Sequence, residues 1–553
     1  AWLGYRIAAL RRYRDPRGAL TMLEEVAGLA TDAGDRVLAA GVLFLRGNLH
    51  CYVGEFGPGL DALVDGAAAL DALVDAERER LRSLGAIAGF ALDVRQQQAT
   101  LVMRLAGTGR FGEACRVGEP LLGVPKEAHP ANNVGDLAEA NAVRGLAIAH
   151  AALGQPDEAR RGFARARSIF QRLGDHFHVG MVATQELQWI AVPYRADRPA
   201  ERVHLAALAE QAWARAGAAL ADLPARFARL PLLFLEGDWA AARELALIVH
   251  ARGGSYKATA TRVLALLTLG QGDRILAQRL IQDELPDGPH TPVGTVNFST
   301  VLLLQRLAAV MALDAGDPRE AREWLDAHDR WLAWSGAVLG RAEGQLGWAA
   351  YHRAVGNHVL ARQHAEDALS HANEPRQPLA LLAAHRWLGE LATVAHRYAE
   401  ADTHLEQALA LANACSLVYE RALTLIAVAE LRLALGERGV ARTLVDEARG
   451  ICGSLNARPA LARADALAAR LVHASPPRSD DPAGLTAREV EVLRLIAAGQ
   501  SNREIAASLV LSERTVEKHI AHVYAKIGAR GRADAVAYAV RRGLLPASAH
   551  HPS

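Results

Sequence analysis

Basic and small side chains share one face of a predicted helix near the carboxyl end of the chain, over residues 513–527. At 100° per residue, Val516, Ile520, Val523 and Ile527 form one apolar stripe that faces inward. The opposite face presents Arg514, Lys518, Ala521, His522 and Ala525, with Glu517 and His519 on its flanks. Long cations can reach phosphates or the acceptor atoms of guanine, and alanines allow a helix to approach closely. This face therefore suits the major groove of double-stranded DNA.

Two shorter helices are predicted to hold this helix in place. Thr486 with Glu489, and Ser501 with Glu504, each have the spacing of a capping box at a helix start. Gly499 marks the end of the first helix, and Ser512 is the expected N-cap of the third. The short connection before Ser512 predicts a helix-turn-helix. The residues expected to face the core are Val490, Leu493 and Ala497 on the first helix, and Ile505, Ala506 and Leu509 on the second.

Positive charge is concentrated in residues 485–545. This segment holds ten Lys and Arg residues and six Asp and Glu residues, for a net charge of +4. The whole chain has 62 basic and 61 acidic residues, so the remainder has 52 against 55, or −3. A local excess of cations on an otherwise acidic chain is expected where a polyanion binds.

The segment resembles the C-terminal DNA-binding domain of LuxR/FixJ-type transcription regulators. The residues that carry the resemblance are Leu485, Thr486, Glu489, Val492, Leu493, Gly499, Asn502, Glu504, Ile505, Ala506, Leu509, Ser512, Thr515, Val516, His519, Ile520, Lys526, Ile527, Gly528 and Arg532. The resemblance implies a four-helix domain whose third helix, 513–527, reads the DNA and whose fourth helix, 532–542, forms a dimer contact. With the groove face, it predicts DNA contacts by Arg514, Thr515, Glu517, Lys518, His519, Ala521, His522, Lys526 and Arg532.

Three positions depart from the family pattern. Some members carry cations at the positions of Glu517 and Ala521, so the family's operator contacts cannot be carried over whole. Glu517 cannot bind phosphate, but it could accept a hydrogen bond from cytosine N4. Gly531 stands where Ser or Asn is frequent and is expected to loosen the start of the fourth helix. The alternative interpretation of the segment is a helical bundle with a basic face.

The composition is that of an ordinary soluble globular protein with several domains or repeats. The 553 residues are too many for one core, and 51% of them are apolar and 22% charged. No run of about 18 apolar residues lacks a charge or a breaker, and no signal peptide is present, which predicts a cytoplasmic protein without a membrane contact. Cys51, Cys115, Cys415 and Cys452 are far apart, so we interpret them as buried small residues in a reducing compartment, not as disulfides or a zinc site.

Residues 1–473 are helical in pattern, and part of this region repeats every 40 residues. Gly316, Gly356 and Gly436 lie at multiples of this interval, and His396 occupies the vacant position. Three further sets keep the interval: Ala321, Ala361, Ala401 and Ala441; Leu325, Ala365, Leu405 and Val445; and His328, Ala368, Ala408 and Ala448. Each unit is interpreted as two antiparallel helices around a Gly-centred turn, with the first Ala at their closest approach. Weaker copies turn at Gly54, Gly109, Gly154, Gly237 and Gly272.

These offsets resemble the tetratricopeptide repeat (TPR), and Leu388-Gly389 matches the first helix of that motif. The resemblance implies about nine to eleven units in a right-handed superhelix with a concave groove. The predicted fold class is all-α. It comprises a TPR-like superhelix at 1–473, a linker at 474–484, a four-helix LuxR-type helix-turn-helix domain at 485–545 and a disordered tail at 546–553. A generic Ala-rich helical protein is the alternative to the repeat.

Helical repeats followed by a LuxR-type domain also resemble the C-terminal part of the large ATP-binding LuxR regulators, which include MalT-like proteins. Those proteins carry an NTPase module ahead of the repeats, whereas no GxxxxGK[ST] motif occurs in this chain. We therefore expect no ATPase activity from these residues. Because Ala1 already lies inside a helical pattern, the expectation is either a truncated chain or a member without the module.

Two further groups of residues have both a structural and a functional interpretation. His176 and His178 are two residues apart and do not share a helix face, so a loop or a helix end is favoured over a metal site. Trp324, Trp331 and Trp334, with His328 between them, share a helix face. Packing between repeats is the favoured role for these tryptophans. The alternative, an aromatic surface that binds a ligand in the concave groove, is retained. No cofactor and no metal are predicted.

Together these patterns predict a transcription regulator that is not an enzyme. Residues 485–545 are expected to bind double-stranded DNA as a homodimer, and residues 1–473 to sense a small molecule or a protein. RNA polymerase is a further candidate partner. The alternative function is a TPR-type interaction scaffold in which DNA binding is secondary.

Overall fold

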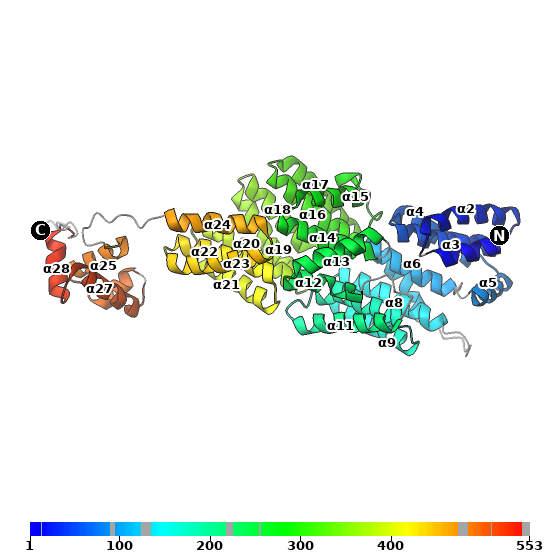
Figure 1. Ribbon diagram of the computed structural model, residues 1–553, viewed down its shortest axis with the longest axis horizontal. Helices are drawn as coiled ribbons and strands as arrows, with labels where there is room; N and C mark the ends of the chain where they lie inside the picture. Colours follow the sequence, from blue (N-terminus) through cyan, green and yellow to red (C-terminus); the bar gives the residue numbers. More distant parts are fainter. Residues whose placement is uncertain are drawn as a thin grey trace. The chain divides into compact units, whose positions relative to one another are not determined.

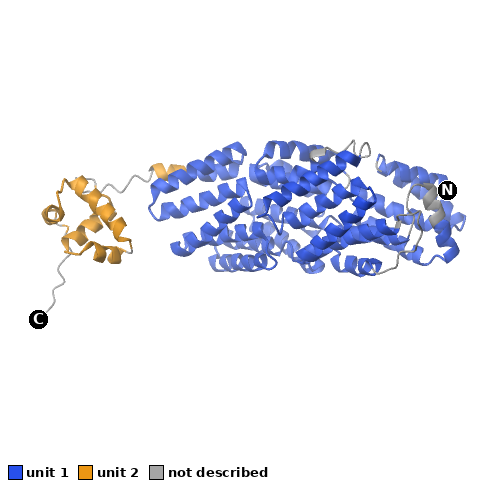
Figure 2. Cartoon of the chain, turned by 90° about the horizontal axis from the view of Figure 1, so that it is seen from below, with its two compact units in different colours: residues 1–465 blue, residues 466–553 orange. Residues whose placement is uncertain are grey.

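The computed structural model describes residues 1–12, 14–88, 94–122, 134–216, 225–253, 256–473, 485–509, 511–542 and 544. Within these ranges the chain forms helices and turns and no β-strand, which confirms the predicted all-α class (Figure 1). The chain divides into two compact units, residues 1–465 and 466–553 (Figure 2). None of the helices in the described ranges combines the length and apolar character that crossing a membrane requires.

The first helices of the larger unit pack mainly on their neighbours in sequence, as in α3 on α4 and α6 on α7 and α8. This is the pattern expected when each unit buries its apolar face against the next one. The helices are α1 (Trp2–Arg11), α2 (Pro16–Asp32), α3 (Arg36–Val53), α4 (Phe56–Asp71), α5 (Asp75–Ala88), α6 (Val94–Thr108), α7 (Phe111–Gly118) and α8 (Val134–Ala152), with the 3₁₀ turn η1 (Glu119–Leu122) after α7.

The middle of the unit is less regular, because single turns of 3₁₀ and π geometry interrupt the helical hairpins. The helices are α9 (Pro156–Arg172), α10 (His176–Glu186), α11 (Pro199–Ala216), α12 (Leu230–Glu236), α13 (Trp239–Arg252), α14 (Lys257–Gln271) and α15 (Arg274–Glu284). Between them lie the π turn η2 (Leu187–Ala191) and the 3₁₀ turns η4 (Ala225–Arg229) and η6 (Gly288–His290).

The most regular hairpins follow, stacked side by side in Figure 1. They are α16 (Phe298–Asp314) with α17 (Pro318–Ser335), α18 (Arg341–Ala354) with α19 (His358–Asn373), α20 (Pro378–Val394) with α21 (Tyr398–Ala414), α22 (Val418–Ala434) with α23 (Arg438–Ser454), and then α24 (Arg458–His473). The second helices begin at Pro318, His358, Tyr398 and Arg438, which are 40 residues apart. The structure thus confirms the helical repeat and its period.

The residues that keep the 40-residue interval lie inside these hairpins. All twelve members of the three predicted sets are buried, with at most 1% of any of them exposed. Between α20 and α21 the approach is so close that a Cβ on Gly389 would lie 2.5 Å from Leu405 Cγ and 3.3 Å from the Ala401 carbonyl oxygen. A larger side chain at Gly389 or Ala401 would therefore force the two helices apart.

The turns between paired helices use a left-handed residue, as the Gly spacing predicts. Gly316, Gly356 and Gly436 have φ angles of 78°, 79° and 80°. His396, which occupies the vacant Gly position, takes the same conformation with φ of 58°. Gly54, Gly109, Gly154, Gly237 and Gly272, the predicted weaker turns, also have positive φ. The His396 turn shows that the hairpin geometry is imposed by the repeat even where the residue does not favour it.

The tryptophans of α17 are mainly core residues. Trp331 is 0% exposed and Trp324 is 5% exposed, and between them Nε2 of the buried His328 accepts a hydrogen bond from Arg306 Nη1 at 3.1 Å. Trp334 is 40% exposed and meets Trp331 edge to face at 5.9 Å. The packing interpretation therefore describes Trp324 and Trp331, and a ligand shelf would rest on Trp334 alone.

His176 and His178 lie at a helix end, as predicted. His176 is the first residue of α10, and Asp175 is its N-cap, accepting the backbone N–H of His178 at 3.0 Å. The Nδ1 atom of His178 lies 2.6 Å from the other Asp175 oxygen, and its ring stacks on Phe170. The position of the His178 ring therefore follows from its contact with the N-cap residue Asp175 and its packing on Phe170.

The predicted domain boundaries remain predictions. The boundary at residue 473 coincides with the end of α24, while the division between the two compact units falls inside that helix, between Asp465 and Ala466. The predicted linker at 474–484 and tail at 546–553 lie outside the described residues.

Candidate nucleic-acid interface

Four short helices form the end of the described chain. They are α25 (Ala487–Ala497), α26 (Asn502–Leu509), α27 (Glu513–Ile527) and α28 (Arg532–Arg541). The bounds of α27 match the prediction, and α28 ends one residue before the predicted Arg542. Their apolar sides meet in one core, whose buried members are Leu485, Val492, Leu493, Ile496, Ile505, Ala506, Val516, Ile520, Val523, Ala535 and Ala539. A core drawn from all four helices fixes their mutual orientation.

The core differs from the prediction on α25. Val492, Leu493 and Ile496 carry the contact, whereas Val490 and Ala497 are only partly buried. The helix packs against both α27 and α28, so its buried face is wider than a single stripe and is centred nearer Val492. On α26 and α27 the predicted inward residues are buried or partly buried, as expected.

Side-chain caps start the first three helices. Thr486 and Glu489 form a complete capping box: the Glu489 N–H donates to Thr486 Oγ1 at 3.3 Å, and the Thr486 N–H donates to Glu489 Oε2 at 2.7 Å. Ser501 and Glu504 repeat the arrangement at 3.3 and 2.7 Å. Ser512 Oγ accepts the Thr515 N–H at 3.1 Å. The three predicted caps therefore set where α25, α26 and α27 begin.

The face of α27 opposite the core is exposed. Its exposed residues are Arg514, Glu517, Lys518, Ala521, His522 and Ala525, and Thr515 and His519 are half-buried at its edges. Within the described residues, neither Arg514 nor Lys518 has a hydrogen bond or an ion pair. Both cations are thus free to bind a ligand, and the alanines between them leave room for its close approach.

Two of the predicted contact residues already have partners within this domain. Lys526 Nζ donates to Glu489 Oε2 at 2.6 Å, which ties the last turn of α27 to the capping box of α25. Arg532 Nη2 donates to the Gln500 carbonyl oxygen and so ties the start of α28 to the turn after α25. In this structure both side chains hold helices in place.

The electrostatics of the site are set by these contacts. Burial raises the pKa of Glu489, but hydrogen bonds from Lys526 and Thr486 outweigh it, so the pKa lies below its usual value. Burial lowers the pKa of His519, and the positive charge of Arg488 lowers it further. The carboxylate of Glu489 is therefore ionised, and the ring of His519 neutral, at pH 7.

Arg488 has a positioning role that the sequence interpretation missed. Its Nη2 donates to the Leu509 carbonyl oxygen at 2.9 Å, and its Nη1 lies 2.6 Å from Glu491. The guanidinium thereby satisfies a carbonyl at the end of α26 from the start of α25. The hydrogen bond from Arg488 to Leu509 depends on how α25 packs on α26. The two residues are 21 positions apart, and no local sequence pattern predicts their contact.

The segment that contains these four helices is similar to known proteins. Residues 483–539 match the family described as bacterial regulatory proteins, luxR family. A Mycobacterium bovis protein provisionally named an HTH-type transcriptional regulator is 49% identical over 59 residues, which are 11% of this chain and 7% of that protein. The oxygen regulatory protein NreC of Staphylococcus aureus is 44% identical over 61 residues, 11% of this chain and 28% of NreC. The chain thus covers only a small part of these relatives.

Among solved structures, the chain aligns with a signal transduction ATPase with a tetratricopeptide repeat sensor from Pyrococcus horikoshii. The match covers 92% of this chain and 87% of that chain, with 11% identity and a TM-score of 0.35.

Proposed function

We propose that residues 485–545 bind double-stranded DNA with α27 in the major groove, and that the chain is a sequence-specific transcription regulator. The observation that carries the proposal is the exposed face of α27, where Arg514 and Lys518, without a partner among the described residues, lie beside Ala521 in a capped helix-turn-helix. The similarity of residues 483–539 to luxR-family regulators supports the same function.

Within the interface, we assign two kinds of contact. Arg514 and Lys518 bind phosphates or guanine, because their side chains are long, cationic and exposed. Glu517, His522 and Ala521 face base edges, with Glu517 accepting from cytosine N4, and Thr515 and His519 contact the backbone at the edges of the face. Lys526 and Arg532 lie beside the interface and act through the helices that they hold.

The fourth helix supports a homodimer. α28 buries Ala535 and Ala539 in the domain core and leaves Val540 50% exposed on its other side, close to Arg541. An exposed apolar residue on a short helix suits a two-fold contact between copies, in which each subunit offers the same patch. Two domains paired in this way would read a two-fold symmetric DNA site.

The helical repeats of the larger unit take the sensing role in this proposal. Stacked hairpins offer an extended surface for a protein or a small molecule, and binding there would shift the balance between active and inactive chains. Contact with RNA polymerase is a further part of the proposal, as is a cytoplasmic location, where bacterial DNA and polymerase are found.

The proposal is tested by selection from random oligonucleotides with the full chain, followed by genome-wide mapping of bound DNA. A two-fold consensus recovered in both experiments supports it. Recovery of unrelated sequences, with equal affinity for all of them, would favour an interaction scaffold with secondary DNA binding.

A further inference from the structure

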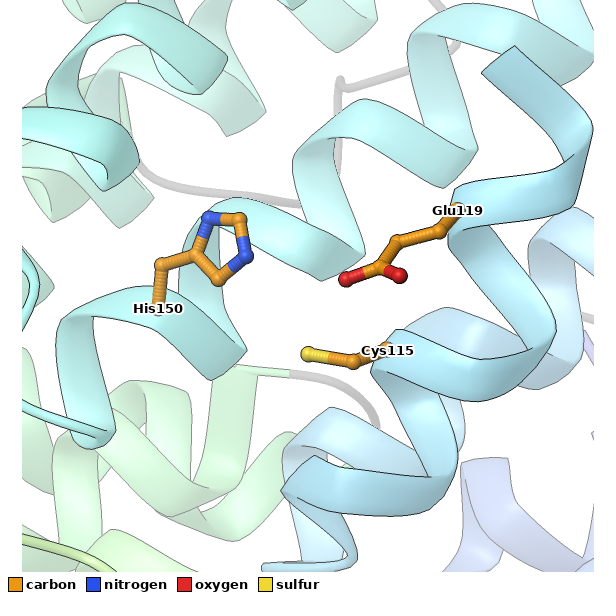
Figure 3. Close-up of side chains that lie close together, drawn as sticks. All are labelled: Cys115, Glu119 and His150. Atoms are coloured by element: carbon orange, nitrogen blue, oxygen red, sulfur yellow. The ribbon is translucent and has the colours of Figure 1, made fainter. Parts of the chain in front are cut away.

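Three metal-binding side chains meet in the larger unit, far from the candidate DNA interface in the sequence. Cys115 lies on α7, Glu119 begins η1, and His150 lies in the last turn of α8. One ligand atom of each, the thiol sulfur, a carboxylate oxygen and a ring nitrogen, all lie within 4.8 Å of one another. Figure 3 shows the three side chains pointing into the same space between the helices.

The backbone places Cys115 and Glu119 on the same side of one helical segment. The helix continues through Glu119, whose φ and ψ are −57° and −43° and whose N–H donates to the Cys115 carbonyl. Residues four apart on a helix lie one above the other, so both side chains project in one direction. This pair is therefore set by local geometry.

Close packing of α7 against α8 places His150 opposite the pair. A Cβ on Gly118 would lie only 2.9 Å from Leu146 Cδ2, so the absence of a side chain at Gly118 allows the helices to approach. Leu146 is one turn before His150 on α8. The approach at Gly118 thus brings the His150 ring to Cys115 and Glu119.

The ligand atoms of Cys115, Glu119 and His150 are not taken up by hydrogen bonds to other described residues. Within the described part of the chain, none of them takes part in a hydrogen bond or an ion pair, and Cys115 is a half-buried free thiol. Burial raises the pKa of the Cys115 thiol, and the charge of Glu119 raises it further. Burial lowers the pKa of His150, although Glu119 and Glu158 act in the opposite direction. Cys115 and His150 are half-buried, whereas Glu119 is exposed, so the three ligand atoms meet at the edge of the α7–α8 contact where an ion can enter from solvent.

We propose that Cys115, Glu119 and His150 bind a divalent transition-metal ion, and that this ion is zinc. A thiolate, an imidazole and a carboxylate are the three ligand types that zinc accepts, whereas calcium and magnesium require oxygen atoms. A tetrahedral zinc ion holds its ligand atoms about 3.3–3.6 Å apart, so small rotations of side chains already within 4.8 Å complete the site. Three protein ligands leave the fourth position to water. This inference does not depend on the proposed DNA binding.

A bound ion would stiffen a junction within the larger unit. The Ala152 carbonyl, at the end of α8, accepts the N–H groups of Val338 and Leu339 at 2.8 and 3.1 Å. The site therefore links α7 to a helix end that already holds a segment nearly 190 residues away in sequence. Metal binding at this junction should raise the temperature at which the larger unit unfolds.

The test is a titration of the metal-free full chain with cobalt(II), which reports on zinc sites through its absorption spectrum. We expect uptake of one equivalent with a thiolate-to-cobalt charge-transfer band, displacement of cobalt by zinc, and a rise in melting temperature with zinc. Cys115→Ala should abolish the band and the thermal shift. Cys452→Ala is the matched control, because it removes a buried thiol on α23 and should leave both unchanged.

A second variant keeps the proposal testable if Cys115→Ala fails to fold. Glu119→Gln keeps the thiolate and should weaken cobalt binding about tenfold or more while the band persists at saturation. No cobalt uptake by the wild-type chain, or an unchanged band in Cys115→Ala, would overturn the site. DNA binding measured on the same samples separates this outcome from a failure of the proposed function.

Discussion

Lys526 Nζ and the Thr486 N–H donate to the same oxygen of Glu489, at 2.6 and 2.7 Å. The Glu489 side chain is 6% exposed, and it connects the start of α25 to the last turn of α27, 37 residues later. The Glu489 carboxylate therefore adds a polar contact between α25 and the proposed recognition helix to the packing of the shared core. Lys526 belongs to the residues predicted to contact DNA, and its pairing gives it a second role in stability.

The first prediction concerns this pair. Lys526→Met leaves the buried carboxylate without its charged donor and should lower the free energy of unfolding by about 1–3 kcal/mol. Lys518→Met removes the same charge from an exposed position that has no ion pair among the described residues, and it should change the free energy of unfolding by less than about 0.5 kcal/mol. Urea unfolding of a fragment of residues 480–553 measures both, and equal effects would show that the Glu489 contact does not stabilise the fold.

The pH dependence of the same variant is the second prediction. The pKa of Glu489 is below its ordinary value in the folded protein, so its stabilising effect is present above the unfolded pKa and is lost as pH falls through the folded pKa. Without Lys526, the folded pKa rises. The stability difference between wild type and Lys526→Met should therefore be largest near pH 7 and shrink toward about pH 3. A difference that is constant over this range would contradict the mechanism.

The third prediction concerns the repeats. Ala401 is 0% exposed and faces α20, so Ala401→Leu should destabilise the larger unit by about 1–3 kcal/mol. Ala410→Leu is the matched control, because Ala410 is exposed on the same helix, α21. Thermal unfolding of the full chain should show a lower first transition for Ala401→Leu alone. The fragment of residues 480–553, which lacks the repeats, should still fold on its own core.

Two glycines of the α22–α23 hairpin give the fourth prediction, because replacement by alanine should change the free energy of unfolding in opposite directions at the two positions. Gly436→Ala forces a Cβ into a turn with φ of 80° and should cost about 1–2 kcal/mol. Gly450→Ala lies on the exposed side of α23 with no atom within 4 Å of the new Cβ, and it should add about 0.5–1 kcal/mol. Thermal melts compare the two, and changes of the same sign would rule out the hairpin register assigned here.

These features differ in how far the sequence could predict them. The burial of Ala401 and the left-handed turn at His396 followed from a 40-residue interval, because equivalent positions in a repeat share one environment. The caps Thr486, Ser501 and Ser512 were visible because capping is local. The Lys526–Glu489 contact and the approach of His150 to Cys115 depend on packing between helices, and no local pattern encodes them. Cys115 was expected to be buried but is half-buried, and its four-residue spacing to Glu119 is the part of the proposed metal site that is local in sequence.

The fifth prediction concerns base reading by Glu517. A carboxylate on a helix in the major groove is repelled by the DNA phosphates, so Glu517 should lower the affinity for DNA unless it makes a specific contact with a base. Glu517→Ala should therefore relax the preference at one base pair and maintain or raise non-specific affinity. Selection from random oligonucleotides with both proteins shows the change, and an identical consensus would exclude base reading by Glu517.

The central claim is that the exposed face of α27 binds DNA, and the most direct measurement is a gel-shift titration at several salt concentrations. Arg514→Ala and Lys518→Ala should each weaken binding to a selected DNA site by about 1–3 kcal/mol if the residue meets a base, or lower the salt slope by about one if it meets a phosphate. Arg494→Ala removes an exposed cation from α25 and should have a smaller effect on both quantities. Unchanged binding in both α27 variants, or an equal loss in Arg494→Ala, would contradict the assignment of this face.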